Sequence, residues 1–556
     1  MQFFQMIILL VLLYLPLFAY ARPIGTQPNF LILFPDQWRF DWGSNLTYQL
    51  YSPSSPSLAL SMPTFNKLYN SGIRFTKAHV PSPLCAPSRS CLASGKEYDY
   101  AGVPDNFSND YPLNQTTVYT LLQDIGYYTM TTGKDDLTKA TGMGINGTYH
   151  AQQLGWVNYS RCAGKDDVLR MGIPADPYGY YTSQNSEILP NGTKVTWWKI
   201  LSELDKSCCE NAGGSGTEYV CDEPTLMPQL GYEDNYIASH TMKLLETVPT
   251  NQPWFLQINF AGPHPPFIVT SSMMNTTQEL SFPIAINNTL MSNNDQQIVR
   301  RDYAAELENL DSLFNKILTT LYNREDANNT IIIMASDHGE ELGDHNNWGK
   351  TMPWSGSASV PFVITPSSME LATVLGIPIN RTINHVPVTT MDITGTVLDF
   401  AGTVPCENMT TVSLRSLLTN ATSSVESPQY RTYTQSGLGN WRMVLQSTAY
   451  MNSSITNTST IYKFICCKGP CPGQPGSNHA FIDDEWKTIF KNSNATTSTS
   501  SLSTTSIVSL TEQNTTNVKL LYDINNDPYD TTNLADTYPL VVAVMRELLP
   551  PGWCKG

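Results

Sequence analysis

Residues 28–36, PNFLILFPD, form a continuous apolar run that ends in an acid. Such a run is typical of a strand buried on both faces of a parallel sheet. The same form recurs at residues 254–267, WFLQINFAGPHPPF, and at residues 330–339, TIIIMASDHG. Each predicted strand is followed by polar side chains that can carry chemistry, namely Asp36, His264, and Asp337 with His338.

An amphipathic helix is predicted between the last two of these strands, at residues 303–321. One helical stripe carries Leu307, Leu310, Phe314, Ile317 and Leu321. Strands that alternate with amphipathic helices predict a doubly wound α/β domain with a mixed sheet flanked by helices. Ligands of such domains bind outside the carboxyl ends of the strands, so we expect the polar residues at the three strand ends to converge on one site.

The amino-acid composition and the length of the apolar segments change at about residue 425. Beyond it come shorter apolar segments, a Cys/Gly/Pro-rich patch at 466–476 and a Ser/Thr tract at 493–506. We therefore predict a large α/β domain at 22–425 and a smaller C-terminal α+β subdomain at 426–556. The Ser/Thr tract is expected to form a flexible glycosylated loop within this subdomain.

The first 21 residues predict a cleaved signal peptide. Their apolar run is short and closes with the small-x-small pattern Ala19-Tyr20-Ala21. The remaining sequence contains no segment long and apolar enough for a membrane anchor. Glycosylation sequons are abundant, and they include Asn45, Asn106, Asn114, Asn146, Asn191, Asn275, Asn380, Asn420 and Asn494. We expect a glycoprotein that passes through the endoplasmic reticulum and is either secreted or lysosomal.

The number of cysteines and the net charge limit the kinds of function that the chain can have. The chain has 11 cysteines, and in an oxidising compartment an odd count leaves one thiol unpaired. We expect Cys85 to be that thiol. The other ten cysteines are expected to form disulfides, whose pairing cannot be read from the sequence. The net charge of -16 argues against a nucleic-acid partner and against attraction to anionic membranes. An anionic substrate would need a locally basic pocket.

The segment around Cys85, CAPSRSCLASGK at residues 85–96, carries a specific resemblance. Its Cys-x-Pro-Ser-Arg pattern, followed by Gly95 and Lys96, resembles the signature of the type I, formylglycine-dependent sulfatases of the alkaline phosphatase superfamily. The resemblance implies an alkaline-phosphatase-like fold and hydrolysis of a sulfate monoester on a small molecule or, as in many relatives, a carbohydrate. It also implies that the formylglycine-generating enzyme oxidises Cys85 to formylglycine (3-oxoalanine).

The chemistry of sulfate esters explains why such a residue is needed. An ordinary serine or cysteine nucleophile would be left as a stable sulfated adduct. A hydrated aldehyde can attack with one hydroxyl and expel sulfate with the other, which restores the aldehyde.

The resemblance also implies a metal site formed by Asp36, the modified Cys85, Asp337 and His338. Carboxylate oxygens suit Ca²⁺, whereas the imidazole leaves Mn²⁺ or Zn²⁺ open. Many relatives carry Asp-Asp and Asp-Asn where this chain has Asp36-Gln37 and Asp337-His338, a combination that resembles another branch of the superfamily.

The remaining family positions imply a catalytic set. Arg89 would orient the formylglycine, Lys134 and Lys350 would contact the sulfate oxygens, and His264 would protonate the departing alcohol. Asp136 stands where many sulfatases have a histidine, so it is either a general base or a structural residue. His345 is interpreted as a supporting residue beside the site.

Two other functions stay open at this point. The same nucleophile and metal can act on phosphorus, so a phosphonate or phosphodiester hydrolase of the superfamily is one alternative. A catalytically inactive glycoprotein that binds sulfated glycans is the other. The sequence leaves the oligomeric state open.

Overall fold

The computed structural model describes residues 26–43, 60–139, 150–165, 168–169, 173, 176–205, 221–419, 430–451, 460–472 and 517–554. Within these residues no helix is both long and apolar enough to cross a membrane. Several predictions fall outside this part of the chain: the signal peptide, the Ser/Thr tract, and the sequons at Asn45, Asn146, Asn420 and Asn494.

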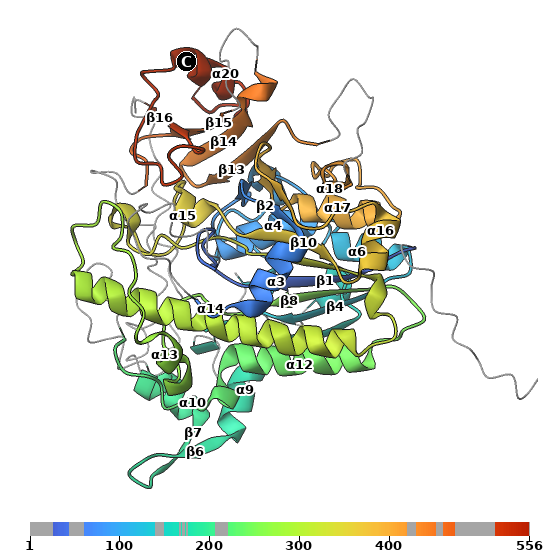
Figure 1. Ribbon diagram of the computed structural model, residues 1–556, viewed down its shortest axis with the longest axis vertical. Coiled ribbons are helices and arrows are strands. Elements are labelled where there is room, and N and C mark those ends of the chain that lie inside the picture. The colour runs from blue at the N-terminus through green and yellow to red at the C-terminus, as the bar shows by residue number, and fades with distance from the viewer. Residues whose placement is uncertain are drawn as a thin grey trace, which may run out of the picture.

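An eight-stranded mixed sheet forms the centre of the molecule (Figure 1), with strand order β11-β2-β10-β9-β1-β8-β4-β5. Its strands are β1 (Asn29–Phe34), β2 (Ile73–Phe75), β4 (Tyr128–Gly133), β5 (Asn158–Arg161), β8 (Trp254–Asn259), β9 (Thr330–Ala335), β10 (Phe362–Pro366) and β11 (Arg381–Ile383). Strand β1 is parallel to both neighbours, β8 and β9, and β4 and β5 continue the parallel part. Strand β10 is antiparallel to β9 and to β2. The predicted mixed α/β sheet is confirmed.

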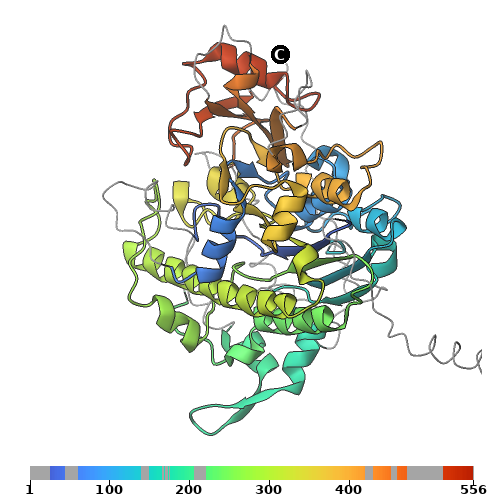
Figure 2. The ribbon, with the colours of Figure 1, turned by 45° about the vertical axis from the view of Figure 1, so that its right-hand side comes forward.

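Helices cover both faces of this sheet, as Figures 1 and 2 show. One face packs against α3 (Pro63–Ser71), α12 (Glu233–Thr247) and α14 (Asn293–Tyr322), and the other against α4 (Cys85–Ser94), α6 (Val118–Asp124) and α17 (Asp392–Ala401). Side chains of β1 alternate between the two cores: Leu31 and Leu33 enter the first, Phe30 and Ile32 the second. The unbroken apolar run of β1 is explained, because both faces of this strand are buried.

The predicted helix at 303–321 lies within α14, and its five stripe residues are fully buried. The helix begins ten residues earlier, where the Ser292 hydroxyl accepts a hydrogen bond from the amide of Asp295. The extra turns contain few apolar residues. Polar side chains such as Gln296 and Arg300 are buried there instead, so hydrophobic periodicity alone did not reveal them.

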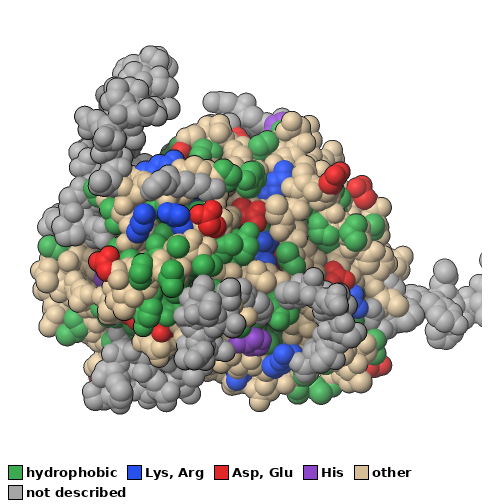
Figure 3. All heavy atoms as spheres, turned by 90° about the horizontal axis from the view of Figure 1, so that it is seen from above, with side chains coloured by type: hydrophobic (Ala, Val, Ile, Leu, Met, Phe, Trp, Pro, Cys, Tyr) green, Lys and Arg blue, Asp and Glu red, His purple; other side chains and the backbone are tan. Residues whose placement is uncertain are grey.

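Within the described residues, the C-terminal subdomain is a four-stranded antiparallel sheet with one α-helix. Its strands are β13 (Tyr433–Leu438), β14 (Trp441–Ser447), β15 (Ile461–Cys467) and β16 (Val518–Asp523), and its helix is α20 (Pro539–Arg546). It lies at the top of Figure 1, above the edge of the large domain. The face seen from above in Figure 3 mixes acidic, basic and apolar side chains. The prediction of a smaller α+β part at the C-terminus is confirmed.

Short elements complete the described part of the fold. The strands are β3 (Ala78–His79), β6 (Ser186–Ile188), β7 (Lys194–Thr196) and β12 (Val388–Thr389). The helices are α5 (Tyr98–Ala101), α7 (Ala151–Leu154), α9 (Pro177–Gln184), α10 (Trp197–Lys199), α13 (Ser271–Thr277), α15 (Ser355–Ala358), α16 (Met369–Leu375) and α18 (Arg415–Leu418).

Cysteine pairing differs from the prediction. Disulfides join Cys466 to Cys554 and Cys467 to Cys471, and Cys221 is also disulfide-bonded. The expectation that Cys85 is the one unpaired thiol is wrong, because Cys91, Cys162 and Cys406 are free as well. Cys91 and Cys162 are fully buried, where a thiol packs as a small apolar group.

One predicted glycosylation site is also wrong. The side chain of Asn106 is buried, and its Oδ1 accepts a hydrogen bond from the amide of Ala86 in the first turn of α4. A glycan on Nδ2 of this buried side chain has no room in the folded chain. The sequons at Asn114, Asn191, Asn275 and Asn380 are exposed.

Buried carboxyl groups gather where α12 meets α14. Glu233 and Asp234 begin α12, Glu306 lies on α14, and all three are buried. Burial raises the pKa of Glu233 to about 8 and that of Glu306 to about 7. Lys165 forms an ion pair with Glu306, so only part of this negative charge is compensated.

These shifts predict a stability that falls as pH rises. A carboxyl group whose pKa is raised by folding stabilises the fold fully below its unfolded pKa, and this contribution is lost as pH rises through the folded pKa. The window here runs from about pH 4.5 to about pH 8. We expect the melting temperature to decrease across this window in thermal scans at constant ionic strength.

Glu233→Gln should flatten that decrease, whereas Glu279→Gln, at an exposed position, should leave the profile unchanged. If the melting temperatures of the wild type and Glu233→Gln decreased equally with pH, the raised pKa of Glu233 would be contradicted as the cause.

Candidate active site

The carboxyl ends of four neighbouring parallel strands bring the predicted polar residues together. Asp36 follows β1, Asp337 follows β9, Lys134 directly follows β4, and His264 lies in the loop after β8. Cys85 is the first residue of α4, which packs against the same sheet. The convergence expected from the strand ends is what the structure shows.

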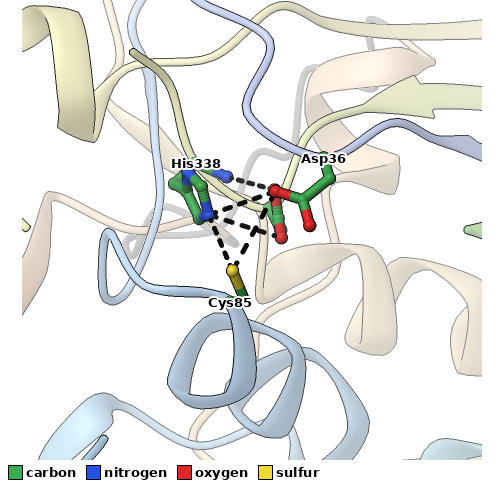
Figure 4. Close-up of side chains that lie close together, drawn as sticks. Asp36, Cys85 and His338 are labelled. Atoms are coloured by element: carbon green, nitrogen blue, oxygen red, sulfur yellow. Dashed lines mark hydrogen bonds and ion pairs between the residues drawn. The ribbon is translucent and has the colours of Figure 1, made fainter. Parts of the chain in front are cut away.

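Four potential metal ligands surround one point. Asp36, Cys85, Asp337 and His338 each place one ligand atom within 4.8 Å of the others, and all four residues are fully buried. Sγ of Cys85 lies 3.3 Å from Nε2 of His338 and 4.0 Å from Oδ1 of Asp36. Figure 4 shows the thiol pointing from the start of its helix towards the imidazole and the carboxylate.

The hydrogen bonds of His338 fix its orientation. Nδ1 donates to the carbonyl of Gly339 at 3.0 Å, which leaves the lone pair of Nε2 facing the carboxylates. Burial lowers the pKa of this imidazole below its ordinary value, so the ring is neutral. A neutral imidazole whose other nitrogen is held by a carbonyl is the usual form of a metal-binding histidine.

Asp36 is ionised in this setting. Burial by itself raises its pKa, but the positive charge of Lys134, together with that of Lys350, outweighs that effect and holds the pKa well below its ordinary value. Two carboxylates and one imidazole nitrogen thus converge within a buried space. This donor set fits a divalent cation.

Arg89 ties the strand ends together. Its Nε lies 3.0 Å and its Nη2 2.9 Å from Oδ2 of Asp337. Nη2 also lies 3.5 Å from Oδ2 of Asp36. The other terminal nitrogen donates to the carbonyl of Lys134 at 2.6 Å and to Oδ1 of Asn259 at 3.0 Å. The sequence analysis did not single out Asn259. The one pattern that points to it is its position at the end of the apolar segment that forms β8.

Two ammonium groups flank the thiol. Nζ of Lys350 lies 3.1 Å from Sγ of Cys85, and Nζ of Lys134 lies 3.9 Å from it. Lys134 also pairs with Oδ2 of Asp36 at 2.7 Å. Despite both cations, burial and the charge of Asp36 raise the pKa of Cys85 to about 12. The unmodified chain therefore presents a neutral thiol, which is a poor nucleophile.

His264 lies against Lys350. Its Nδ1 donates to the carbonyl of Pro265 at 2.6 Å, so Nε2 accepts from Nζ of Lys350 at 2.7 Å. Lys350 also donates to Oε1 of Gln37 at 3.1 Å, and Gln37 in turn binds Glu340. Gln37 thus orients the lysine, a contact that the sequence did not reveal.

Asp136 and His345 contact other groups. Carboxylate Oδ2 of Asp136 lies 3.6 Å from Nζ of Lys134 and 3.7 Å from Nζ of Lys139, a third buried lysine that sequence reasoning missed. Nε2 of His345 lies 2.8 Å from the carbonyl oxygen of Tyr529 in the C-terminal part of the chain.

Comparisons with known proteins agree with this fold. The family model described as sulfatase matches residues 28–403. A choline-sulfatase of Rhizobium meliloti is 24% identical over 407 residues, which cover 68% of each chain. The solved phosphonate monoester hydrolase of Agrobacterium radiobacter superposes with a TM-score of 0.63 at 17% identity, over 94% of each chain. BT4656, solved in complex with D-glucosamine-2-N,6-O-disulfate, gives a TM-score of 0.60 at 15% identity, over 94% of this chain and 98% of that one.

These results define a hydrolase of the alkaline phosphatase superfamily. Within it, the chain belongs to the sulfatase family. It is a sulfuric ester hydrolase.

The Arg89 network gives a first test of the site. Arg89→Lys keeps the positive charge but loses the planar fork that binds Asp337 and Asn259 together. We expect kcat/KM for an aryl sulfate to fall about 10- to 100-fold, as is usual when a residue that orients ligands is changed. Arg415→Lys, in an exposed ion pair with Asp399, is the matched control and should retain activity. Equal kinetics for the two variants would contradict the role of Arg89.

Proposed function

We propose that this chain is a secretory-pathway sulfatase that hydrolyses a sulfate monoester on a carbohydrate. Its nucleophile would be a formylglycine made from Cys85 by the formylglycine-generating enzyme. The observation that carries the proposal is the position of Sγ of Cys85, which lies among the potential metal ligands and beside two lysines. A sulfate group bound there would meet positive charge on several sides.

The chemistry of residue 85 supports its conversion. A buried thiol with a pKa of about 12 offers almost no thiolate at physiological pH. The hydrated aldehyde would supply an oxygen nucleophile and a second hydroxyl for release of sulfate.

The proposed metal is Ca²⁺, held by Asp36, Asp337, His338 and the modified residue 85. Two carboxylates favour a hard cation, and the imidazole would also suit Mn²⁺ or Zn²⁺. When bound, the cation would supply charge neutralisation for sulfate oxygens.

The chain's own residues would perform the other tasks. Lys134 and Lys350 would hold the non-bridging sulfate oxygens through Nζ, with Gln37 fixing the direction of Lys350. His264, in its protonated form, would donate the proton at Nε2 to the departing alcohol, and this nitrogen lies beside Nζ of Lys350. Asp136 would balance the charges of Lys134 and Lys139, and its two ion pairs favour this structural role over that of general base.

A sulfated sugar is the proposed substrate class. BT4656 was solved with a disulfated glucosamine as its substrate, and the exposed sequons of this chain suit a secreted or lysosomal glycoprotein. The acidic net charge argues against nucleic acid as a partner.

The phosphonate monoester hydrolase with the same fold makes a second activity worth measuring. We expect kcat/KM to be at least about 10-fold higher on the sulfate ester than on a phosphonate ester of the same phenol. Cys85→Ala should lower both rates at least about 1,000-fold, whereas Cys91→Ala on the same helix should retain activity. A preference for the phosphonate would make the chain a phosphonate hydrolase, and an active Cys85→Ala would remove the proposed nucleophile.

Metal binding can be tested without turnover. In thermal scans of EDTA-treated protein, added Ca²⁺ should raise the melting temperature, because a ligand that binds only the folded chain stabilises it. Asp337→Asn should abolish the increase, and Asp124→Asn, at an exposed position on α6, should keep it. An unchanged increase in Asp337→Asn would place the cation elsewhere.

A further inference from the structure

The segment that carries Lys350 is anchored to the C-terminal part of the chain as well as to the large domain. We call residues 349–355 the lysine loop. It connects the turns after β9 to the short helix α15. The amide of Glu341 donates to the carbonyl of Gly349 at 2.8 Å, which holds the start of the loop to the large domain. Lys350 itself contacts the large domain, whereas Thr351, Trp354 and Ser355 also contact residues of the C-terminal part of the chain.

Thr351, directly after the lysine, has an unfavourable backbone conformation. Its φ is +78°, a region that β-branched residues rarely adopt. Two hydrogen bonds hold it there: its amide donates to the carbonyl of Pro83 at 3.0 Å, and its carbonyl accepts from Nε1 of Trp441 at 3.1 Å. Thr351 thus links the segment that leads into Cys85 to strand β14 of the C-terminal sheet.

A buried ion pair holds the far end of the loop. Nζ of Lys463 on β15 lies 2.7 Å from Oδ2 of Asp530 and donates to Oγ of Ser355 at 2.8 Å. The same carboxylate oxygen accepts from the amide of Ser355 at 2.7 Å. Lys463 is fully buried and Asp530 nearly so. Both charges come from the C-terminal part of the chain, and both bind the lysine loop.

Apolar packing joins the same surfaces. Met352 and Trp354 of the loop share a core with Trp441 and with other residues of the C-terminal sheet. Leu84, the residue before the nucleophile, belongs to this core as well. The segment before Cys85 is also tied to β13, because the amide of Gly437 donates to the carbonyl of Pro81 at 3.1 Å.

The C-terminal sheet therefore contacts both segments whose side chains meet at the active centre. We propose that this sheet positions the catalytic groups, with Trp441 and the Lys463–Asp530 pair holding the lysine loop so that Nζ of Lys350 stays beside residue 85. Trp441 is a positioning residue, since it acts through Lys350. The inference rests on the proposed role of Lys350 in binding sulfate oxygens.

A double-mutant cycle tests this coupling. Trp441→Phe removes the indole N–H donor to Thr351 but keeps an aromatic ring in the core. We expect kcat/KM on an aryl sulfate to fall about 10- to 100-fold, because a small displacement of a charge-stabilising group is costly. In a Lys350→Ala background the same substitution should change kcat/KM by less than about 2-fold. A merely structural role would give the same loss in both backgrounds.

Binding of inorganic sulfate, measured by calorimetry, repeats the cycle without turnover. Trp441→Phe should weaken sulfate binding only when Lys350 is present. The matched control is Trp553→Phe, which changes a buried tryptophan on the opposite face of the C-terminal sheet, in a different core. It should show no coupling to Lys350, whatever its effect on the melting temperature.

The outcomes separate the two proposals. An inactive wild type, or a Lys350→Ala variant with full activity and sulfate affinity, would overturn the proposed function. An active wild type that depends on Lys350, with Trp441→Phe either unchanged or equally harmful in both backgrounds, would overturn the positioning role alone.

Discussion

One buried guanidinium group holds the active centre together. Arg89 binds Asp337 and approaches Asp36, and it also binds the carbonyl of Lys134 and the amide oxygen of Asn259. These partners lie at the ends of β9, β1, β4 and β8, so a single side chain fixes four strand ends relative to one another. The arrangement depends on the pairing, because a carboxylate left alone in such a buried place would be strongly destabilising.

The electrostatics of the site contrast with those of the whole chain. A protein of net charge -16 repels anionic substrates at long range, yet its centre gathers Arg89, Lys134, Lys139 and Lys350 around residue 85. The positive charge expected near an anion-binding site is therefore carried by buried side chains. Ion pairs with Asp36, Asp136 and Asp337 offset part of this positive charge, which allows several cations to lie buried close together.

The sequence predicted the parts of the fold that depend on local patterns. Continuous apolar runs ending in polar residues revealed β1, β8 and β9, and their shared edge of the sheet brought Asp36 and Asp337 together. Long-range contacts could not be read in this way. Three features depend on residues that are distant in the chain. They are the burial of Asn106, the contact of Gln37 with Lys350, and the contacts of the C-terminal sheet with the lysine loop. The free thiols Cys91 and Cys162 were likewise hidden, since pairing depends on spatial proximity.

The proposed reaction depends most directly on the chemical state of residue 85. The chain should be expressed in a secretory host that contains the formylglycine-generating enzyme, and the tryptic peptide Ala78–Arg89, AHVPSPLCAPSR, should be weighed. The account predicts a peptide that has lost the sulfur of Cys85 and carries an aldehyde that reacts with hydrazides. An intact or disulfide-linked Cys85, in a host that converts a control sulfatase, would contradict it.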